Sequence, residues 1–177
     1  MLTCQKYTAV SLLAASTLWL FALMAGQPAQ ASPASASELA PSQDATPILT
    51  LHVDGQRYAV SRADIETLPM YEITLTHFEG IEGSFAGVWL DDFLAENDLG
   101  GHPQLRFIAH DDYTVFLSRE DREQKRFLLA TRLDGDPLTL TEFGPSMLIV
   151  PEDASAIASG TASMSHWIWS IRDIIAQ

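Results

Sequence analysis

The stretch ILTLHVDGQRYAV, residues 48–60, begins the folded part of this chain. Apolar and polar side chains alternate over residues 49–53 and again over residues 58–60, which is the period of a β-strand. The two alternating runs are separated by Asp54-Gly55, a dipeptide typical of tight hairpin turns. The stretch therefore predicts a β-hairpin.

Similar short apolar runs follow along the chain. They predict further strands at residues 71–75, 105–109, 113–117, 127–131, 147–150 and 167–174. Ser61 with Asp64, and Ser118 with Asp121, have a spacing that resembles a capping box, so each predicts the start of a short helix.

A third helix is predicted between two groups of glycines. Gly80, Gly83 and Gly87 are expected to lie in a loop, a helix is expected over residues 88–94, and Gly100-Gly101 is expected to end it. Short strands dominate, so the expected fold class is α+β, with a mixed, partly barrel-like sheet and short helices.

The N-terminus has the features of a secretory signal peptide. Lys6 is the only charged residue before Glu38, an apolar run covers residues 9–25, and Ala29-Gln30-Ala31 supplies a small-x-small cleavage site. We expect cleavage after Ala31, a flexible lead-in over residues 32–47, one domain over residues 48–177, and a periplasmic location. An uncleaved membrane anchor is the alternative, because the apolar run approaches the length of a transmembrane helix.

Cleavage would leave 146 residues, enough for one ordinary domain with a hydrophobic core. Because residues 1–31 contain one lysine and no acid, the net charge would change from −13 to −14. An acidic surface disfavours binding to nucleic acid and to anionic membranes. The single cysteine, Cys4, would leave with the leader, so the mature protein would contain neither a disulfide nor a thiolate.

The sequence contains no recognisable catalytic or metal-binding motif. It has no nucleophile elbow, no glycine-rich phosphate loop, no HExxH pair and no calcium loop. The pair Asp91-Asp92 is expected on the solvated face of a helix, whereas Asp111-Asp112 is expected in a turn between two strands, where polar groups often meet ligands. We expect one functional carboxylate in this turn, with a purely structural role in the turn as the alternative, and we predict no catalytic residue.

Five segments, in this order, resemble the molybdopterin-binding domain of the sulfite-oxidase superfamily. They are FAGVWLDDFL (85–94), AHDDY (109–113), LATRLDGDPL (129–138), GPSMLIVP (144–151) and WSI (169–171). The likeness is closest to small exported members that lack the cysteine which binds molybdenum in the enzymes, so no molybdenum is expected here. Those members bind a pterin and act with the periplasmic sensor regions of membrane-bound cyclic-di-GMP enzymes.

The resemblance implies a site that binds a pterin, in the tetrahydro form. A carboxylate can accept the adjacent N–H donors of the pterin's amino-pyrimidinone edge, and an aromatic ring can cover its flat face. The predicted ligand-binding residues are Asp111, Asp112, Tyr113, Arg132, Gly144, Pro145 and Trp169. Asp111 or Asp112 would accept, Tyr113 and Trp169 would stack, Arg132 would bind oxygens, and Gly144-Pro145 would let the backbone approach the ring.

The resemblance also implies a regulatory function. The expected protein is a periplasmic pterin sensor that sets the activity of a membrane-bound cyclic-di-GMP cyclase or phosphodiesterase. Two alternatives are an oxidoreductase that binds molybdopterin through an atypical metal ligand, and an interaction module that binds protein partners without any ligand.

Overall fold

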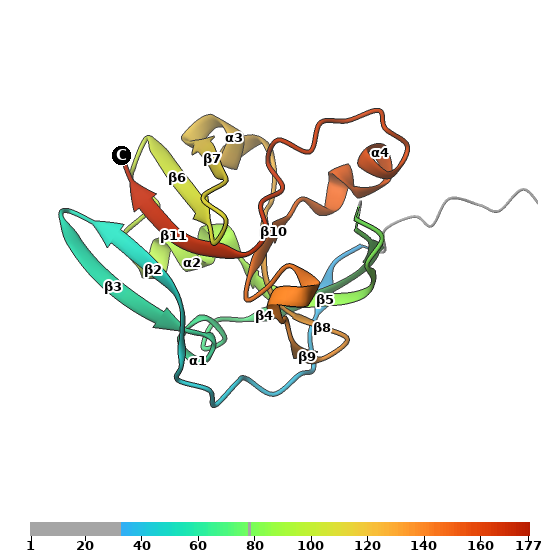
Figure 1. Cartoon of the computed structure of the whole chain (residues 1–177), viewed down its shortest axis with the longest axis horizontal. Helices are drawn as coiled ribbons and strands as arrows, with labels where there is room; N and C mark the ends of the chain where they lie inside the picture. Colours follow the sequence, from blue (N-terminus) through green and yellow to red (C-terminus); the bar gives the residue numbers. More distant parts are fainter. Residues whose placement is uncertain (1–32, 78) are drawn as a thin grey trace, which may run out of the picture.

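The structure is a computed structural model that describes residues 33–77 and 79–177, and Figure 1 shows the arrangement of its elements. The predicted signal peptide lies outside the described residues. Within the described part of the chain, no helix is long and apolar enough to span a membrane.

Two β-sheets form the protein, with short helices between their strands. Sheet A has the strand order β1-β4-β5-β8-β10, and β9 pairs with β8 at its end. These strands are β1 (Ser35–Ala36), β4 (Met70–Thr76), β5 (Glu82–Trp89), β8 (Leu128–Leu133), β9 (Asp136–Pro137) and β10 (Met147–Ile149). Every pairing in sheet A is antiparallel.

Sheet B has the strand order β3-β2-β11-β6-β7. These strands are β2 (Pro47–Val53), β3 (Gln56–Ser61), β6 (Gln104–Ala109), β7 (Thr114–Ser118) and β11 (Ile171–Ala176). β11 pairs with β2 in parallel and with β6 antiparallel, so this sheet is mixed. Figure 1 shows sheet B on the left of the view and most of sheet A on the right.

The α+β class predicted from the sequence is confirmed, but the expected partly barrel-like sheet is not. The strands form two sheets, and neither closes into a barrel. Alternation along each strand reports which face is buried, and it carries no information about which strands pair.

The predicted hairpin and both capping boxes are present. Asp54 and Gly55 have φ angles of 50° and 77°, the left-handed values that a two-residue hairpin turn of the favoured hand requires. The hydroxyls of Ser61 and Ser118 accept hydrogen bonds from the backbone N–H groups of Asp64 and Asp121, respectively. The helices that follow are α1 (Arg62–Ile65) and α3 (Arg119–Gln124).

The remaining helices are also short. They are α2 (Leu90–Glu96), α4 (Ala154–Ala158) and the 3-10 turns η1 (Leu140–Glu142) and η2 (Pro151–Asp153). The core between the sheets and helices contains large side chains that are almost completely buried, among them Phe85, Phe93, Phe107, Phe127 and Trp167.

The expected loop at Gly83 and Gly87 is wrong, because both glycines lie inside β5. The pairing between β5 and β8 shifts its register after Ala86, and this shift leaves Thr131 as an extra residue on β8. There a Cβ atom on Gly87 would stand 2.0 Å from the carbonyl oxygen of Leu129. The glycine therefore permits the close approach of two strands.

Two further expectations differ from the structure. The predicted flexible lead-in is bound to the fold from Ser35 onward, because β1 pairs with β4 and the Ser37 N–H donates to the carbonyl of Met70. The predicted last strand starts only at Ile171, so Trp167 and Trp169 lie in the segment before β11.

The close approach at Gly87 yields a stability prediction. Gly87→Ala is expected to lower the free energy of unfolding, measured in urea, by more than about 2 kcal/mol, because the added methyl group overlaps the backbone of β8. Gly101→Ala is the matched control. No atom lies within 4 Å of the added Cβ there, so its effect should stay within about 0.5 kcal/mol. Equal effects of the two substitutions would contradict the prediction.

Candidate functional site

Three segments from distant parts of the sequence meet where the two sheets join. They are the β6–β7 turn (110–113), the segment before β10 (143–146) and the segment before β11 (167–170). Ser170 lies between the other two, since its N–H donates to the Phe143 carbonyl at 2.7 Å and its carbonyl accepts from the His110 N–H at 2.8 Å. The Leu148 N–H, in sheet A, donates to the Ile168 carbonyl at 2.8 Å.

Each of these three segments contains a non-glycine residue with a left-handed backbone. The φ angles are 67° at Asp112, 61° at Phe143 and 51° at Ser170. This conformation is uncommon for side chains with a Cβ atom and persists only where the surroundings enforce it. Such residues often gather at functional sites, and here they gather at one junction.

Tyr113 and Trp169 form an aromatic pair at this junction. Their rings are nearly parallel, with an interplanar angle of 17° and a centroid separation of 6.2 Å. Both side chains line a cavity of about 220 Å³, together with Ser163, Met164, Ser165 and Trp167. We call this the aromatic cavity. Tyr113 is 49% exposed and Met164 is 47% exposed, so apolar surface faces solvent at its rim.

His77 lies among the aromatic rings next to this cavity. Its ring centroid is 5.4 Å from that of Trp167, 6.0 Å from that of Phe143 and 6.3 Å from that of Trp169. His77 is 1% exposed, and burial lowers its pKa from 6.5 to about 4. The imidazole is therefore neutral at neutral pH, and its ring packs as one more aromatic group.

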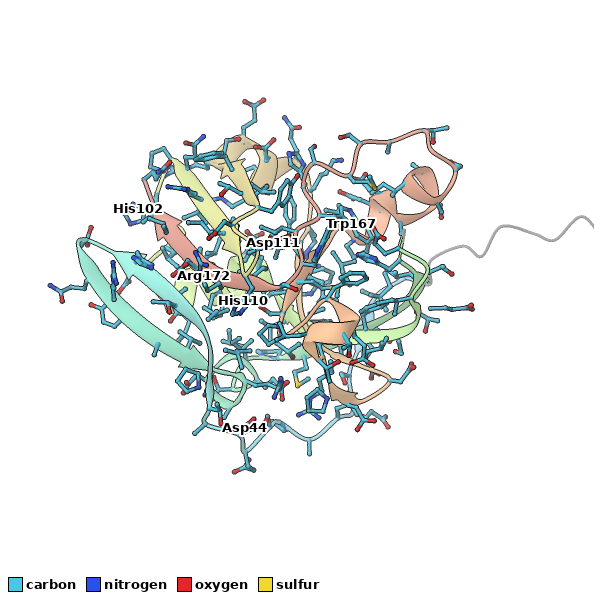
Figure 2. All side chains as sticks on the ribbon, in the orientation of Figure 1. Asp44, His102, His110, Asp111, Trp167 and Arg172 are labelled. Carbon is cyan, nitrogen blue, oxygen red and sulfur yellow. The ribbon has the colours of Figure 1, made fainter. Side chains whose placement is uncertain are left out.

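The structure separates the roles of the two predicted carboxylates. Asp112 forms an ion pair with Arg172, at 3.0 Å between Oδ1 and Nη1. Arg172 also binds Asp173 at 2.8 Å, and Asp173 binds His52 at 2.8 Å. Asp111 is exposed, and its Oδ1 accepts from the Tyr113 N–H at 3.1 Å. Asp111 forms no ion pair with a described residue and is not among the residues that line the aromatic cavity. Figure 2 labels it together with Arg172 and Trp167.

The structure brings Gly144 and Pro145 to the junction but gives Gly144 a different role from the predicted one. The peptide bond between them is cis. A Cβ atom on Gly144 would stand 2.6 Å from the carbonyl oxygen of Leu138, so this glycine permits internal packing. The space beside Gly144, which was predicted to admit a ligand, is occupied by the backbone of Leu138.

Arg132 does not line the aromatic cavity, and its role in binding a ligand stays a prediction. Its Nε and Nη2 donate to the two carboxylate oxygens of Glu66 at 3.0 and 2.5 Å. Nη1 donates to the Gly135 carbonyl, and Nη2 also donates to the Ala40 carbonyl. The guanidinium is thus committed to structural contacts in sheet A and the N-terminal segment.

Sequence reasoning missed several residues of the aromatic cavity. Met164 lines the cavity, and His77 and Phe143 pack beside it. Neither His77 nor Met164 has a neighbour in sequence that would mark it as part of a site, whereas Phe143 precedes the predicted pair Gly144-Pro145. The two tryptophans at positions 167 and 169 were the only feature of the sequence that pointed to these residues. Within residues 33–77 and 79–177, no three His, Cys, Asp or Glu side chains gather as a metal-binding group would.

No protein-family model matches the chain, and the search of curated proteins found no match.

The buried His77 yields a prediction about pH. Its folded pKa of about 4 lies below the ordinary value of 6.5, so the unfolded chain takes up a proton that the folded protein excludes. As the pH falls from about 6.5 to about 4, the free energy of unfolding should drop by as much as about 3 kcal/mol from this group.

Urea unfolding at a series of pH values tests this prediction. His77→Phe, which keeps an aromatic ring and removes the titrating group, should show a smaller drop than the wild type. His110→Gln, at an exposed position, should keep the wild-type pH dependence. A variant with Phe at position 77 that keeps the full drop would show that another group is responsible.

Proposed function

We propose that this protein is an exported pterin-binding protein with a fold of the sulfite-oxidase molybdopterin-domain type. The near-parallel pair Tyr113 and Trp169 over the aromatic cavity is the observation that carries this proposal. Tyr113 is half-exposed and Trp169 is partly buried. Two aromatic rings with a common orientation favour a flat ligand, because stacking removes their faces from water. The five sequence segments that resemble the superfamily add support.

The size of the aromatic cavity favours a bare bicyclic ring. Its volume of about 220 Å³ lies below the roughly 300 to 1,000 Å³ that is usual for drug-sized ligands. Asp111 would accept hydrogen bonds from the amino-pyrimidinone edge, since its Oδ2 accepts none from the described residues. The hydroxyls of Ser163 and Ser165 line the same cavity and would bind further polar atoms of the ligand.

The donor set of the aromatic cavity does not fit a molybdenum-bearing cofactor. The residues that line it supply hydroxyls, aromatic rings and the thioether of Met164, and no thiolate. Molybdenum in the enzymes that the sequence resembles is held through a cysteine thiolate, and Cys4 is the only cysteine of this chain. We therefore assign no redox step and no catalytic residue to this site.

A regulatory function requires that the ligand and a partner protein affect the same element. Tyr113 lines the aromatic cavity and immediately precedes β7, an edge strand of sheet B. Phe116, on β7, is 48% exposed. β7 thus connects the aromatic cavity to an exposed aromatic side chain on an edge strand. We propose that the periplasmic sensor region of a membrane-bound cyclic-di-GMP enzyme binds there and responds to the pterin.

Titration calorimetry with tetrahydrobiopterin under reducing conditions tests the ligand. The wild type should bind, and Trp169→Ala should weaken binding about tenfold or more through the loss of stacking. Phe116→Ala, which removes an exposed aromatic ring outside the cavity, should bind like the wild type. No heat from the wild type, or normal binding by Trp169→Ala, would refute the proposed site.

Cellular cyclic-di-GMP measured in the native host tests the regulatory part separately. Deleting the gene should change the cyclic-di-GMP level, and both Trp169→Ala and Phe116→Ala should fail to restore it. Tyr58→Ala should restore it, because Tyr58 is 53% exposed on β3, the opposite edge of sheet B. An unchanged level after deletion would argue against this partner and leave pterin binding to be judged by calorimetry.

A further inference from the structure

A second cavity, of about 540 Å³, lies along α3 and shares no lining residue with the aromatic cavity. Four cationic side chains line it: Arg119, Arg122, Lys125 and Arg126. The whole chain contains only ten lysines and arginines and has a net charge of −13. Four of these ten residues therefore surround one cavity of a strongly acidic protein. We call it the arginine cavity.

Arg122 is the most deeply buried of the four, at 6% exposed. Its guanidinium donates to the carbonyls of Ser118, Gly100 and His102, at 3.3, 3.5 and 2.6 Å. Burial acts to lower the pKa of Arg122, against the opposing charge of Asp91. Carbonyl dipoles fix the side chain in place, but its positive charge is not cancelled by a bound carboxylate.

Arg126 is held by stacking. Its Cζ lies 3.8 Å from the ring centroid of Trp89, which is a cation–π contact. Trp89 is itself packed against Tyr71, with ring centroids 5.3 Å apart. No acceptor in the described part of the chain receives a hydrogen bond from Arg126. The guanidinium is thus oriented by an aromatic face while its N–H donors remain available.

The carboxylates that line the arginine cavity form no ion pair with its arginines. Asp91, Glu123 and Glu152 line it as well, and Lys125 is bound at 2.5 Å by Asp153. Over residues 33–77 and 79–177, however, no carboxylate oxygen lies within 4 Å of Arg119, Arg122 or Arg126. Burial raises the pKa of Asp91, which disfavours its negative charge.

We infer that the arginine cavity binds an oxyanion-bearing small molecule. The fork of guanidinium donors matches the oxygens of phosphate and carboxylate groups. The Nη2 of Arg119 donates to the Gly101 carbonyl, and the remaining donors of Arg119 together with those of Arg126 would bind the oxyanion. Arg122 would add long-range attraction without changing its own hydrogen bonds. The volume falls in the range of ordinary small-ligand sites. This site does not depend on pterin binding.

Titration calorimetry at low ionic strength with two probes, pyrophosphate and citrate, tests the inference and distinguishes a phosphate from a carboxylate ligand. The wild type should bind at least one probe, and the double variant Arg119→Gln/Arg126→Gln should bind it about tenfold more weakly. Asp91→Asn removes a competing negative charge and should bind more tightly.

Arg57→Gln is the matched control, because Arg57 is an exposed arginine on β3 outside the arginine cavity. It should bind the probe like the wild type. Absence of binding by the wild type to both probes would overturn the inference. Equal weakening by Arg57→Gln and by the double variant would also overturn it, since it would indicate attraction to the overall charge of the surface. Circular dichroism of each variant confirms folding.

Discussion

The buried carboxylate of Glu66 holds together three parts of the chain. Its Oε1 accepts from Thr131 at 2.8 Å and from Arg132 at 3.0 Å, and its Oε2 accepts from Arg132 and from the Ser42 N–H. Burial acts to raise the pKa of Glu66, but these hydrogen bonds and the charge of Arg132 outweigh it and lower the pKa. The carboxylate therefore stays ionised and fixes the N-terminal segment and the end of α1 against β8.

The shifted register between β5 and β8 makes this arrangement possible. Neighbouring residues on a regular strand point to opposite faces, yet Thr131 and Arg132 both reach Glu66, because Thr131 is the extra residue of the bulge. Gly87 lies opposite the bulge and accommodates the closer backbone. Glu66 thus ties α1, which directly follows β3 of sheet B, to β8 of sheet A. Hydrogen bonds around Ser170 join the two sheets at a second place. The aromatic cavity lies at that join.

The sequence predicted the positions of strands and helices better than the pairing of strands and the contacts between distant residues. Period-two alternation located most of the longer strands, and the two capping boxes located α1 and α3, because these signals depend on neighbours in the chain. Gly87 was misplaced in a loop, since a glycine required for close backbone approach has no local mark that distinguishes it from a turn glycine. The ion pair of Arg132 could not be predicted for a similar reason: its partner Glu66 is 66 residues away.

The sequence by itself determined the α+β class, the hairpin, the starts of α1 and α3, and the turn that carries Asp111 and Asp112. All of these follow from interactions within a few residues. Only the tertiary structure decided the division into two sheets, the pairing of Asp112 with Arg172, and the packing of His77 beside Trp169. These depend on contacts between residues far apart in sequence, whose free energy exists only when the whole fold forms.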